Sequence, residues 1–265
     1  MKNIVLLVHE DPGQDARIEA ALDLVRAFEG HLRCVDVTEA PVFPGDFDGT
    51  AAGLLLAEGR KTETQNRKAV EARLAQEGVA WDFVDDLGDL VGCLLSESRL
   101  ADAIVVNCKR DGFFDYDRRG LAAELVTHAR CPIIAAPDRD HGMNVGGVAM
   151  VAWDGSVPAA TALRSTTPLL RLADKVHIVT VGEQHEGPRA EEAAAYLSRH
   201  GVKAEIHEIL ANDDPAPHLI DFAARHGVAY VVMGAYGHGR LAETVFGGVT
   251  QVMIEQARLP LVLAR

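Results

Sequence analysis

The fold is decided by one stretch, Val228-Ala-Tyr-Val-Val-Met-Gly234-Ala-Tyr-Gly237-His-Gly239-Arg-Leu-Ala-Glu-Thr-Val-Phe-Gly247-Gly-Val-Thr250. It joins an apolar run to a helical pattern over Val249–Arg258, and five glycines fall within the 15 positions that begin at Gly234. Glycine lets a ligand approach the backbone closely. A helix N-terminus offers unpaired N–H groups and the positive end of the helix dipole. The stretch therefore predicts a phosphate-binding loop between a strand and a helix.

The totals limit the partners that this loop could serve. The chain has 265 residues, which suffice for one large domain or two of ordinary size. Its net charge is 26 − 39 = −13. A strongly acidic chain repels nucleic acid and anionic membranes, so neither is expected as a partner. Any phosphate site must depend on local groups, because the overall field repels anions.

Cysteine usage and apolar runs indicate a reduced, soluble environment. Cys34, Cys93, Cys108 and Cys131 are far apart and form no CxxC pair or metal-ligand spacing, so we expect buried thiols and no metal site. The N-terminal apolar run is too short for a secretory signal, and no run approaches the ~20 residues of a membrane helix. We expect a cytoplasmic protein.

Outward from the loop, short β-branched runs alternate with helical patterns, which predicts βαβ units and parallel sheets. In the first half we expect strands at Ile4–Val8, His31–Val37, Val79–Val84, Ala103–Val106 and Pro132–Ala136, and helices at Ala16–Phe28, Leu87–Leu100 and Leu121–Ala129. In the second half we expect strands at Val148–Ala152, Lys175–Val181, Lys203–Ile209, Val228–Met233 and Pro260–Ala264, and helices at Pro158–Leu172, Ala190–His200 and Pro215–His226, the last with Asp214 as its N-cap.

The two halves repeat each other. His128-Ala-Arg-Cys-Pro-Ile-Ile matches Gln256-Ala-Arg-Leu-Pro-Leu-Val, and a polar, glycine-rich linker covers residues 138–147. We therefore expect two five-stranded domains, residues 1–138 and 146–265, fused as an intramolecular pseudo-dimer. Residues 41–59 do not fit the repeat. They predict an insertion loop that leads into a helix, with a lid or contact surface as the alternative.

Other phosphate and metal motifs fit the loop poorly. No Walker A string is present, and the loop contains no lysine. Gly237-His-Gly239-Arg-Leu-Ala242 matches a loose dinucleotide pattern, but it follows the fourth strand of its half, and no acidic residue follows the next strand to hold a ribose. His238 stands alone and predicts no metal site.

The remaining pattern has glycines at 234, 237 and 247 after a fourth strand, and it resembles the ATP-binding subset of the universal stress protein family. Val151-Ala-Trp-Asp-Gly-Ser156 is similar to the end of that family's first strand, and Pro260-Leu-Val-Leu263 to its last strand. The resemblance covers both halves and implies a tandem, two-domain member. It implies an α/β fold of two Rossmann-like (adenine nucleotide alpha hydrolase-like) domains. Each would have a five-stranded parallel sheet of order 3-2-1-4-5 with helices on both faces.

The resemblance also implies a site where strands 1 and 4 of the second half lie side by side. Asp154 and the backbone near Ala152 and Val181 would take adenine and ribose, and the glycine-rich stretch would take the phosphates of ATP, with Mg²⁺ as a companion ion. Asp154 has an alternative role as a turn or helix-cap residue. The candidate nucleotide-binding residues are Ala152, Asp154, Val181, Met233, Gly234, Gly237, His238, Gly239, Arg240, Gly247, Gly248, Val249 and Thr250.

Three of these residues carry specific expectations. His238 and Arg240 are the side chains of the loop that could meet phosphate charge, and arginine suits phosphate through its planar donors. Gly248 stands where the family usually has Ser or Thr, so Thr250 would have to supply the hydroxyl. The alternative for His238 and Arg240 is a solvated loop pair.

The first half lacks the pattern. Its matching segment, Asn107–Gly120, contains two glycines, and it has Phe113, Phe114 and Tyr116 where phosphate would need bare backbone. We expect that this half does not bind ATP in the family manner.

Three functions remain open at this point. The favoured one is a nucleotide-binding module in stress response and signalling, without catalytic residues. The alternatives are a slow ATPase or another nucleotide-dependent enzyme on the same fold, and a structural tandem protein that binds nothing. Phosphoryl transfer needs a positioned metal and nucleophile, and the loop offers no carboxylate pair at a defined spacing. A homodimer could form through Leu261–Leu263 if that strand were an edge.

Overall fold

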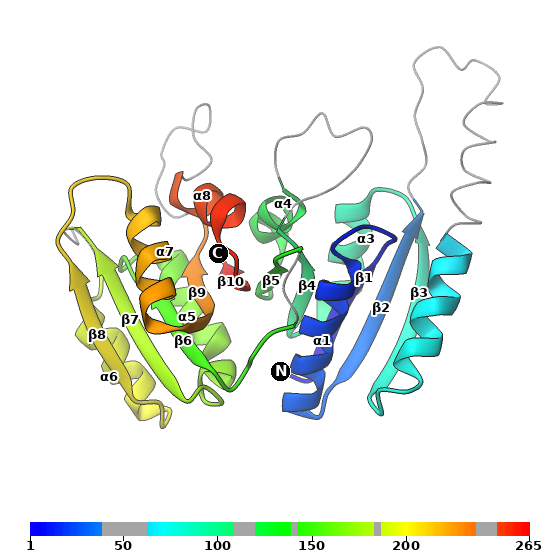
Figure 1. Cartoon of the computed structure of the whole chain (residues 1–265), viewed down its shortest axis with the longest axis horizontal. Helices are drawn as coiled ribbons and strands as arrows, with labels where there is room; N and C mark the ends of the chain where they lie inside the picture. Colours follow the sequence, from blue (N-terminus) through cyan, green and yellow to red (C-terminus); the bar gives the residue numbers. More distant parts are fainter. Residues whose placement is uncertain (39–62, 109–119, 139–141, 183–186, 237–247) are drawn as a thin grey trace, which may run out of the picture.

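The computed structural model describes residues 1–38, 63–108, 120–138, 142–182, 187–236 and 248–265. In this part of the chain, ten strands form one sheet in the order β3-β2-β1-β4-β5-β10-β9-β6-β7-β8 (Figure 1). The expected insertion at residues 41–59 lies outside the described residues.

The first half contributes five strands that are parallel to their neighbours within the half. Its elements are β1 (Asn3–Val8), α1 (Gln14–Phe28), β2 (His31–Thr38), β3 (Ala80–Leu87), α3 (Leu90–Glu97), a 3-10 turn (Ser98–Leu100), β4 (Ala103–Asn107), α4 (Leu121–His128) and β5 (Ile133–Ala136). Residues 63–74 are also helical.

The second half repeats this arrangement, again with parallel neighbours. Its elements are β6 (Val148–Ala152), α5 (Val157–Leu170), β7 (Lys175–Val181), α6 (Ala190–Arg199), β8 (Ala204–Ile209), α7 (Pro215–His226), β9 (Val228–Gly234), α8 (Gly248–Gln256) and β10 (Leu261–Ala264).

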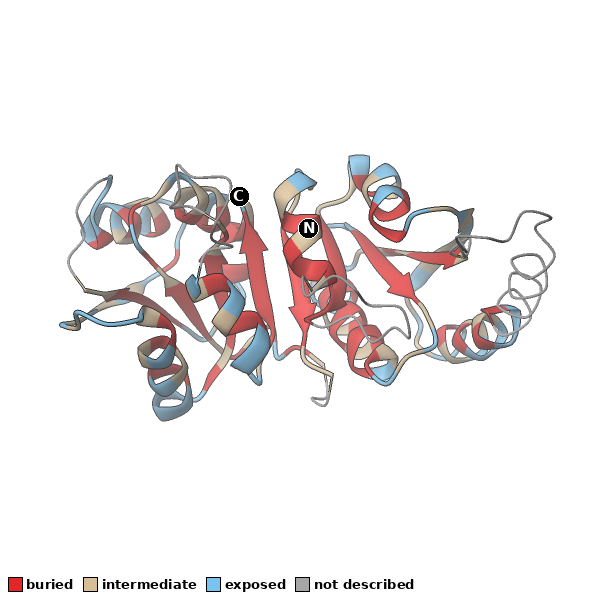
Figure 2. Cartoon of the chain, turned by 90° about the horizontal axis from the view of Figure 1, so that it is seen from above, coloured by how far each residue is buried: buried red, intermediate tan, exposed pale blue. Residues whose placement is uncertain are grey.

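Helices cover both faces of the sheet, as the view from above shows (Figure 2). The central strands are apolar on both faces: all five residues of β4 are buried, and so are all four of β10. Successive side chains of a strand point to opposite faces of the sheet. These strands therefore contribute side chains to two apolar cores, one on each face of the sheet. Burial of both faces explains why the strands show continuous β-branched runs rather than alternation.

The strand order within each half agrees with the expectation. Each half runs 3-2-1-4-5 when its own strands are numbered in chain order. The order reverses between β1 and β4 in the first half and between β6 and β9 in the second. These are the topological switch points at which parallel α/β sheets bind ligands.

The two halves join through their last strands. β5 and β10 pair antiparallel, with Ile134 opposite Val262 at the centre of the register. β10 also pairs with β9 on its other side. Leu261–Leu263, considered above as a possible edge, is not one, because both sides of β10 carry ladder partners within the chain. The halves share one continuous sheet rather than presenting two separate ones.

Most boundaries differ from the expectation by one to three residues, and the clearest difference lies between β3 and α3. The helix expected to begin at Leu87 begins at Leu90, because β3 continues to Leu87 in register with Thr38. Asp89 caps α3 by accepting a hydrogen bond from the backbone N–H of Gly92. The four cysteines are free thiols, and three are buried while Cys131 is half-buried. Among the described residues, no helix has both the length and the apolarity to span a membrane.

Candidate nucleotide site and its counterpart

The carboxyl ends of β6 and β9 lie side by side in the second half. Ala152 is paired with Met233 in the parallel register of these strands. Asp154 follows β6 by two residues, and Gly234 ends β9. The topology thus brings together residues that are 80 positions apart in the sequence. Val181 ends β7, the other neighbour of β6, at the same edge of the sheet.

Asp154 shapes the turn that starts α5. Its carboxylate accepts a hydrogen bond from the backbone N–H of Ser156 at 2.9 Å, and Gly155 between them has φ +77°. Ser156 then caps the helix, because its hydroxyl oxygen accepts from the backbone N–H of Ala159 at 3.2 Å. The Asp-Gly-Ser string is therefore explained locally as a turn and cap. The contact of Asp154 with a ligand stays a prediction.

Gly234 lies against the first turn of α5. A Cβ on this residue would come within 2.4 Å of the backbone nitrogen of Ala159 and 2.6 Å of the carbonyl carbon of Pro158. No side chain fits at that distance, so glycine is needed here for the approach of β9 to α5. The backbone at the end of β9 is consequently free of a side chain that could fill the switch point.

The chain after Gly234 approaches the expected phosphate loop in an uncommon conformation. Tyr236, the last described residue before the loop, has φ +58°, a value that non-glycine residues rarely adopt. The candidates Gly237, His238, Gly239, Arg240 and Gly247 lie outside the described residues.

The far end of the loop is the N-terminus of α8. Gly248 is its first residue and is exposed, with open space where a Cβ would stand. Val249 is half-buried, whereas Thr250 is 4% exposed and belongs to the core side of the helix. The predicted hydroxyl of Thr250 is thus on a buried residue of the first turn.

Trp153, for which the sequence predicted no role, also stabilises this edge of the sheet. Its ring is buried, and its indole N–H donates to the carbonyl oxygen of Pro188 at 3.0 Å. Its backbone N–H donates to the carbonyl oxygen of Val179. The tryptophan ties the segment before α6 to the end of β6. A tryptophan directly before Asp-Gly-Ser was the available sequence signal.

The matching switch point of the first half is filled. Asn107 ends β4 and pairs with Ala136, as Gly234 ends β9 and pairs with Ala264. Asn107 is therefore the counterpart of Gly234. Its side chain is buried and donates to the carbonyl oxygen of Gly13 at 3.1 Å.

The side chain of Arg17, which belongs to α1, occupies the same switch point as Asn107. Its side chain is 1% exposed, and its guanidinium donates to the carbonyl oxygens of Leu7 and His9, to the carboxylate of Asp11 and to the amide oxygen of Asn107. Burial lowers the pKa of Arg17, and the charge of Asp11 opposes that shift. This network was not predicted from the sequence. Its signal was an arginine on the apolar face of a helix, four residues before Ala21.

The family match to known proteins falls on the second half of the chain. The sequence model of the universal stress protein family matches residues 148–265. A universal stress protein from Synechocystis is 27% identical over 121 residues, which are 44% of this chain and 42% of that protein. One from Mycobacterium tuberculosis is 28% identical over 196 residues, 66% of this chain and 65% of that protein. The matches span less than two thirds of the length of either relative.

Solved structures share the fold of the whole chain. A universal stress protein from Archaeoglobus fulgidus superposes with a TM-score of 0.75 at 15% identity, covering 99% of this chain and 96% of that one. A protein from Pseudomonas aeruginosa, described as a putative universal stress protein, gives 0.61 at 16% identity and covers 100% and 93%. Residues 148–265 thus match the universal stress protein family, and the solved structures show that the whole chain shares the fold of these proteins.

Proposed function

We propose that this protein binds one adenine nucleotide, ATP, at the switch point between β6 and β9. The observation that carries the proposal is the contrast between the two switch points. Gly234 leaves the second one without a side chain, whereas Asn107 and Arg17 fill the first. The stoichiometry would be one nucleotide per chain, although the fold is repeated.

The described backbone suits the phosphate and nucleoside ends of such a ligand. The loop after β9 leads into the N-terminus of α8, which has unpaired N–H groups and the positive end of a helix dipole. Asp154 and the ends of β6 and β7 form the opposite side of the switch point. In this proposal Asp154, Ala152 and Val181 meet adenine and ribose, while Met233, Gly234 and the loop residues to Thr250 meet the phosphates and their Mg²⁺.

In this proposal the protein is a binding module in stress response and acts in the cytoplasm. Its two domains are residues 1–138 and 146–265. The nucleotide would act through the conformation or association of the chain rather than through turnover. The first domain would serve as a packed partner of the second through the pairing of β5 with β10.

Calorimetry with ATP and native mass spectrometry of freshly purified protein test the proposal. We expect one retained nucleotide per chain. The double substitution of Gly237→Val and Gly247→Val should abolish binding and leave the circular dichroism spectrum unchanged. Unchanged ATP affinity in that variant would contradict the site, and accumulation of ADP in the sample would favour the ATPase alternative.

The control belongs in the first half, where no binding is expected. Gly120 is unsuitable because a Cβ there would approach the carbonyl oxygen of Cys108 within 2.4 Å and disturb the fold. Glycine 78 lies in the turn before β3 with open space around its Cβ position, but its φ of +67° disfavours a side chain. Gly112→Val is the better control, and ATP binding should be unchanged in it.

A further inference from the structure

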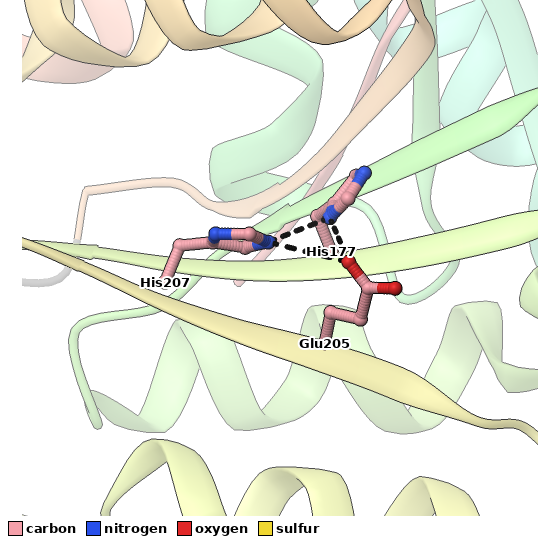
Figure 3. A group of neighbouring side chains, drawn as sticks. All are labelled: His177, Glu205 and His207. Atoms are coloured by element: carbon pink, nitrogen blue, oxygen red, sulfur yellow. Dashed lines mark hydrogen bonds and ion pairs between the residues drawn. The ribbon is translucent and has the colours of Figure 1, made fainter.

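Three side chains with metal-binding atoms meet on strands β7 and β8, away from the proposed nucleotide site. The Nδ1 atom of His177 is 2.8 Å from Nε2 of His207. The Oε2 atom of Glu205 is 3.7 Å from the first nitrogen and 3.8 Å from the second. Figure 3 shows the three groups converging on one point.

The pairing of the strands produces this convergence. Glu205 and His207 are two residues apart on β8, so they share one face of the sheet. His177 is paired with Glu205 across the ladder and lies on the same face. α7 covers this face: the rings of His177 and Phe222 are in edge contact with centroids 5.5 Å apart.

The cluster is buried at His177 and exposed to solvent at Glu205. The side chain of His177 is 2% exposed, that of His207 30%, and that of Glu205 56%. β8 is the outermost strand of this half, which leaves the carboxylate in contact with solvent. A cation could therefore enter from water and reach an imidazole held firmly in the core.

The separations suit a first-row metal ion. Bonds from nitrogen or carboxylate oxygen to zinc measure about 2.0–2.2 Å. Ligand atoms at tetrahedral angles around such an ion are then about 3.3–3.6 Å apart. The observed distances of 2.8, 3.7 and 3.8 Å lie on both sides of that range. Shifts of a few tenths of an ångström to about half an ångström would place all three atoms around one ion.

We propose that His177, Glu205 and His207 bind one divalent transition-metal cation, of the kind represented by Zn²⁺. Two imidazoles and a carboxylate are a ligand set that such ions accept, and the remaining coordination positions face solvent. The site lies outside the proposed nucleotide-binding residues and does not depend on that proposal.

The first half offers an internal comparison. There Arg33 pairs with Asp82 across the ladder, at the positions that His177 and Glu205 hold in the second half. The Arg33 guanidinium lies 3.6 Å from the carboxylate of Asp82 and 2.8 Å from that of Glu97. The repeat thus fills the position with an ion pair in one half and with three metal-binding groups in the other. The fold does not require imidazoles at this position.

Burial and a third imidazole determine the surroundings of His177 and His207. Burial lowers the pKa of His177 and also that of His207. His226 borders both rings, with centroid distances of 5.4 and 5.7 Å. Its Nδ1–H donates to the carbonyl oxygen of Phe222 at 2.9 Å.

One neighbour competes with a metal. The ammonium group of Lys175 is 2.9 Å from Oε2 of Glu205, the oxygen that faces the histidines. Its side chain is 46% exposed and can turn into solvent when a cation takes its place. Removal of this charge should strengthen metal binding, because a positive group disfavours a second cation nearby.

The test uses the full chain, free of any affinity tag and of nucleotide, after treatment with EDTA. Calorimetry with ZnCl₂ should give one Zn²⁺ per chain. Glu205→Gln and His207→Gln should each weaken binding by roughly 100-fold. Both substitutions are at exposed or half-buried positions, so circular dichroism should show an intact fold. Lys175→Met should bind Zn²⁺ more tightly than the natural chain.

Matched controls are His218→Gln and Glu208→Gln. His218 pairs with Asp213 outside the cluster, and Glu208 is exposed on the opposite face of β8. Zn²⁺ affinity should be unchanged in both. The proposal is overturned if the Glu205 and His207 variants bind like the natural chain, if the controls lose binding equally, or if no Zn²⁺ binds. Because nucleotide is absent throughout, failure of ATP binding would not alter the outcome.

Discussion

Gly234 and Gly248 lie at the two ends of the same loop. Packing requires a glycine at position 234 but not at position 248. Gly234 is needed because β9 approaches the first turn of α5, where a Cβ would meet backbone atoms within 2.4–2.6 Å. Gly248 has open space at the Cβ position. A glycine-rich string in a sequence therefore mixes residues required by packing with residues that are free to serve a ligand.

Substitution by alanine should separate these two cases. Gly234→Ala should lower the free energy of unfolding by about 1–3 kcal/mol, because backbone atoms would have to move apart. Gly248→Ala should leave it unchanged or raise it by up to about 1 kcal/mol, because alanine favours the helix. Urea denaturation measures both values. Equal stability of the two variants would contradict the close approach seen at Gly234.

At the scale of elements, the hydrogen bonds of Arg17 and Asn107 in the first half hold β1, α1 and β4 together. Arg17 extends from α1 to carbonyl oxygens at the end of β1 and to Asn107 at the end of β4. The periodic pattern of α1 was predictable from its apolar residues, and so was the presence of the strands, although β3 ends three residues later than expected. The partners of Arg17 were not, because Asn107 is 90 positions away and nothing local relates the two residues.

Removal of the guanidinium should destabilise the chain strongly. Arg17→Met should cost about 3–5 kcal/mol, since it leaves a buried amide, two carbonyl groups and the carboxylate of Asp11 without their donor. Thermal unfolding at neutral pH measures the loss. The control is Arg164→Met at an exposed position of α5, which should change stability by less than about 0.5 kcal/mol.

At the scale of the whole molecule, the antiparallel pair of β5 and β10 turns two repeats into one ten-stranded sheet. The register is centred on Ile134 and Val262, which relates the halves by an approximate two-fold axis. The fusion therefore satisfies within one chain an edge that would otherwise be open.

Separation of the halves should expose that edge. Residues 142–265 expressed alone should form a homodimer, because two copies of β10 can pair antiparallel as β5 and β10 do. Light scattering coupled to size-exclusion chromatography measures the mass. The full chain should not associate through this strand. A monomeric, folded C-terminal half would show that the pairing of β5 with β10 contributes little.

The sequence by itself determined the alternation of strands and helices, the repeat, the family resemblance and the glycine-rich stretch after the fourth strand of the second half. These follow from local periodicity, turn residues and spacing along the chain. Asp214 as the cap of α7 belongs to the same class, and the structure confirms it through a 3.0 Å hydrogen bond from the backbone N–H of Ala216.

Only the tertiary structure decided which distant residues meet. It paired β10 with β5, filled the first switch point with Arg17 and Asn107, and placed His177 beside Glu205 and His207. The physical reason is the same in each case. Strand register and helix packing bring together residues that are 28 to 130 positions apart, and such contacts leave no spacing signal in the sequence. The glycine-rich stretch proposed to bind nucleotide is evident in the sequence because its residues are contiguous.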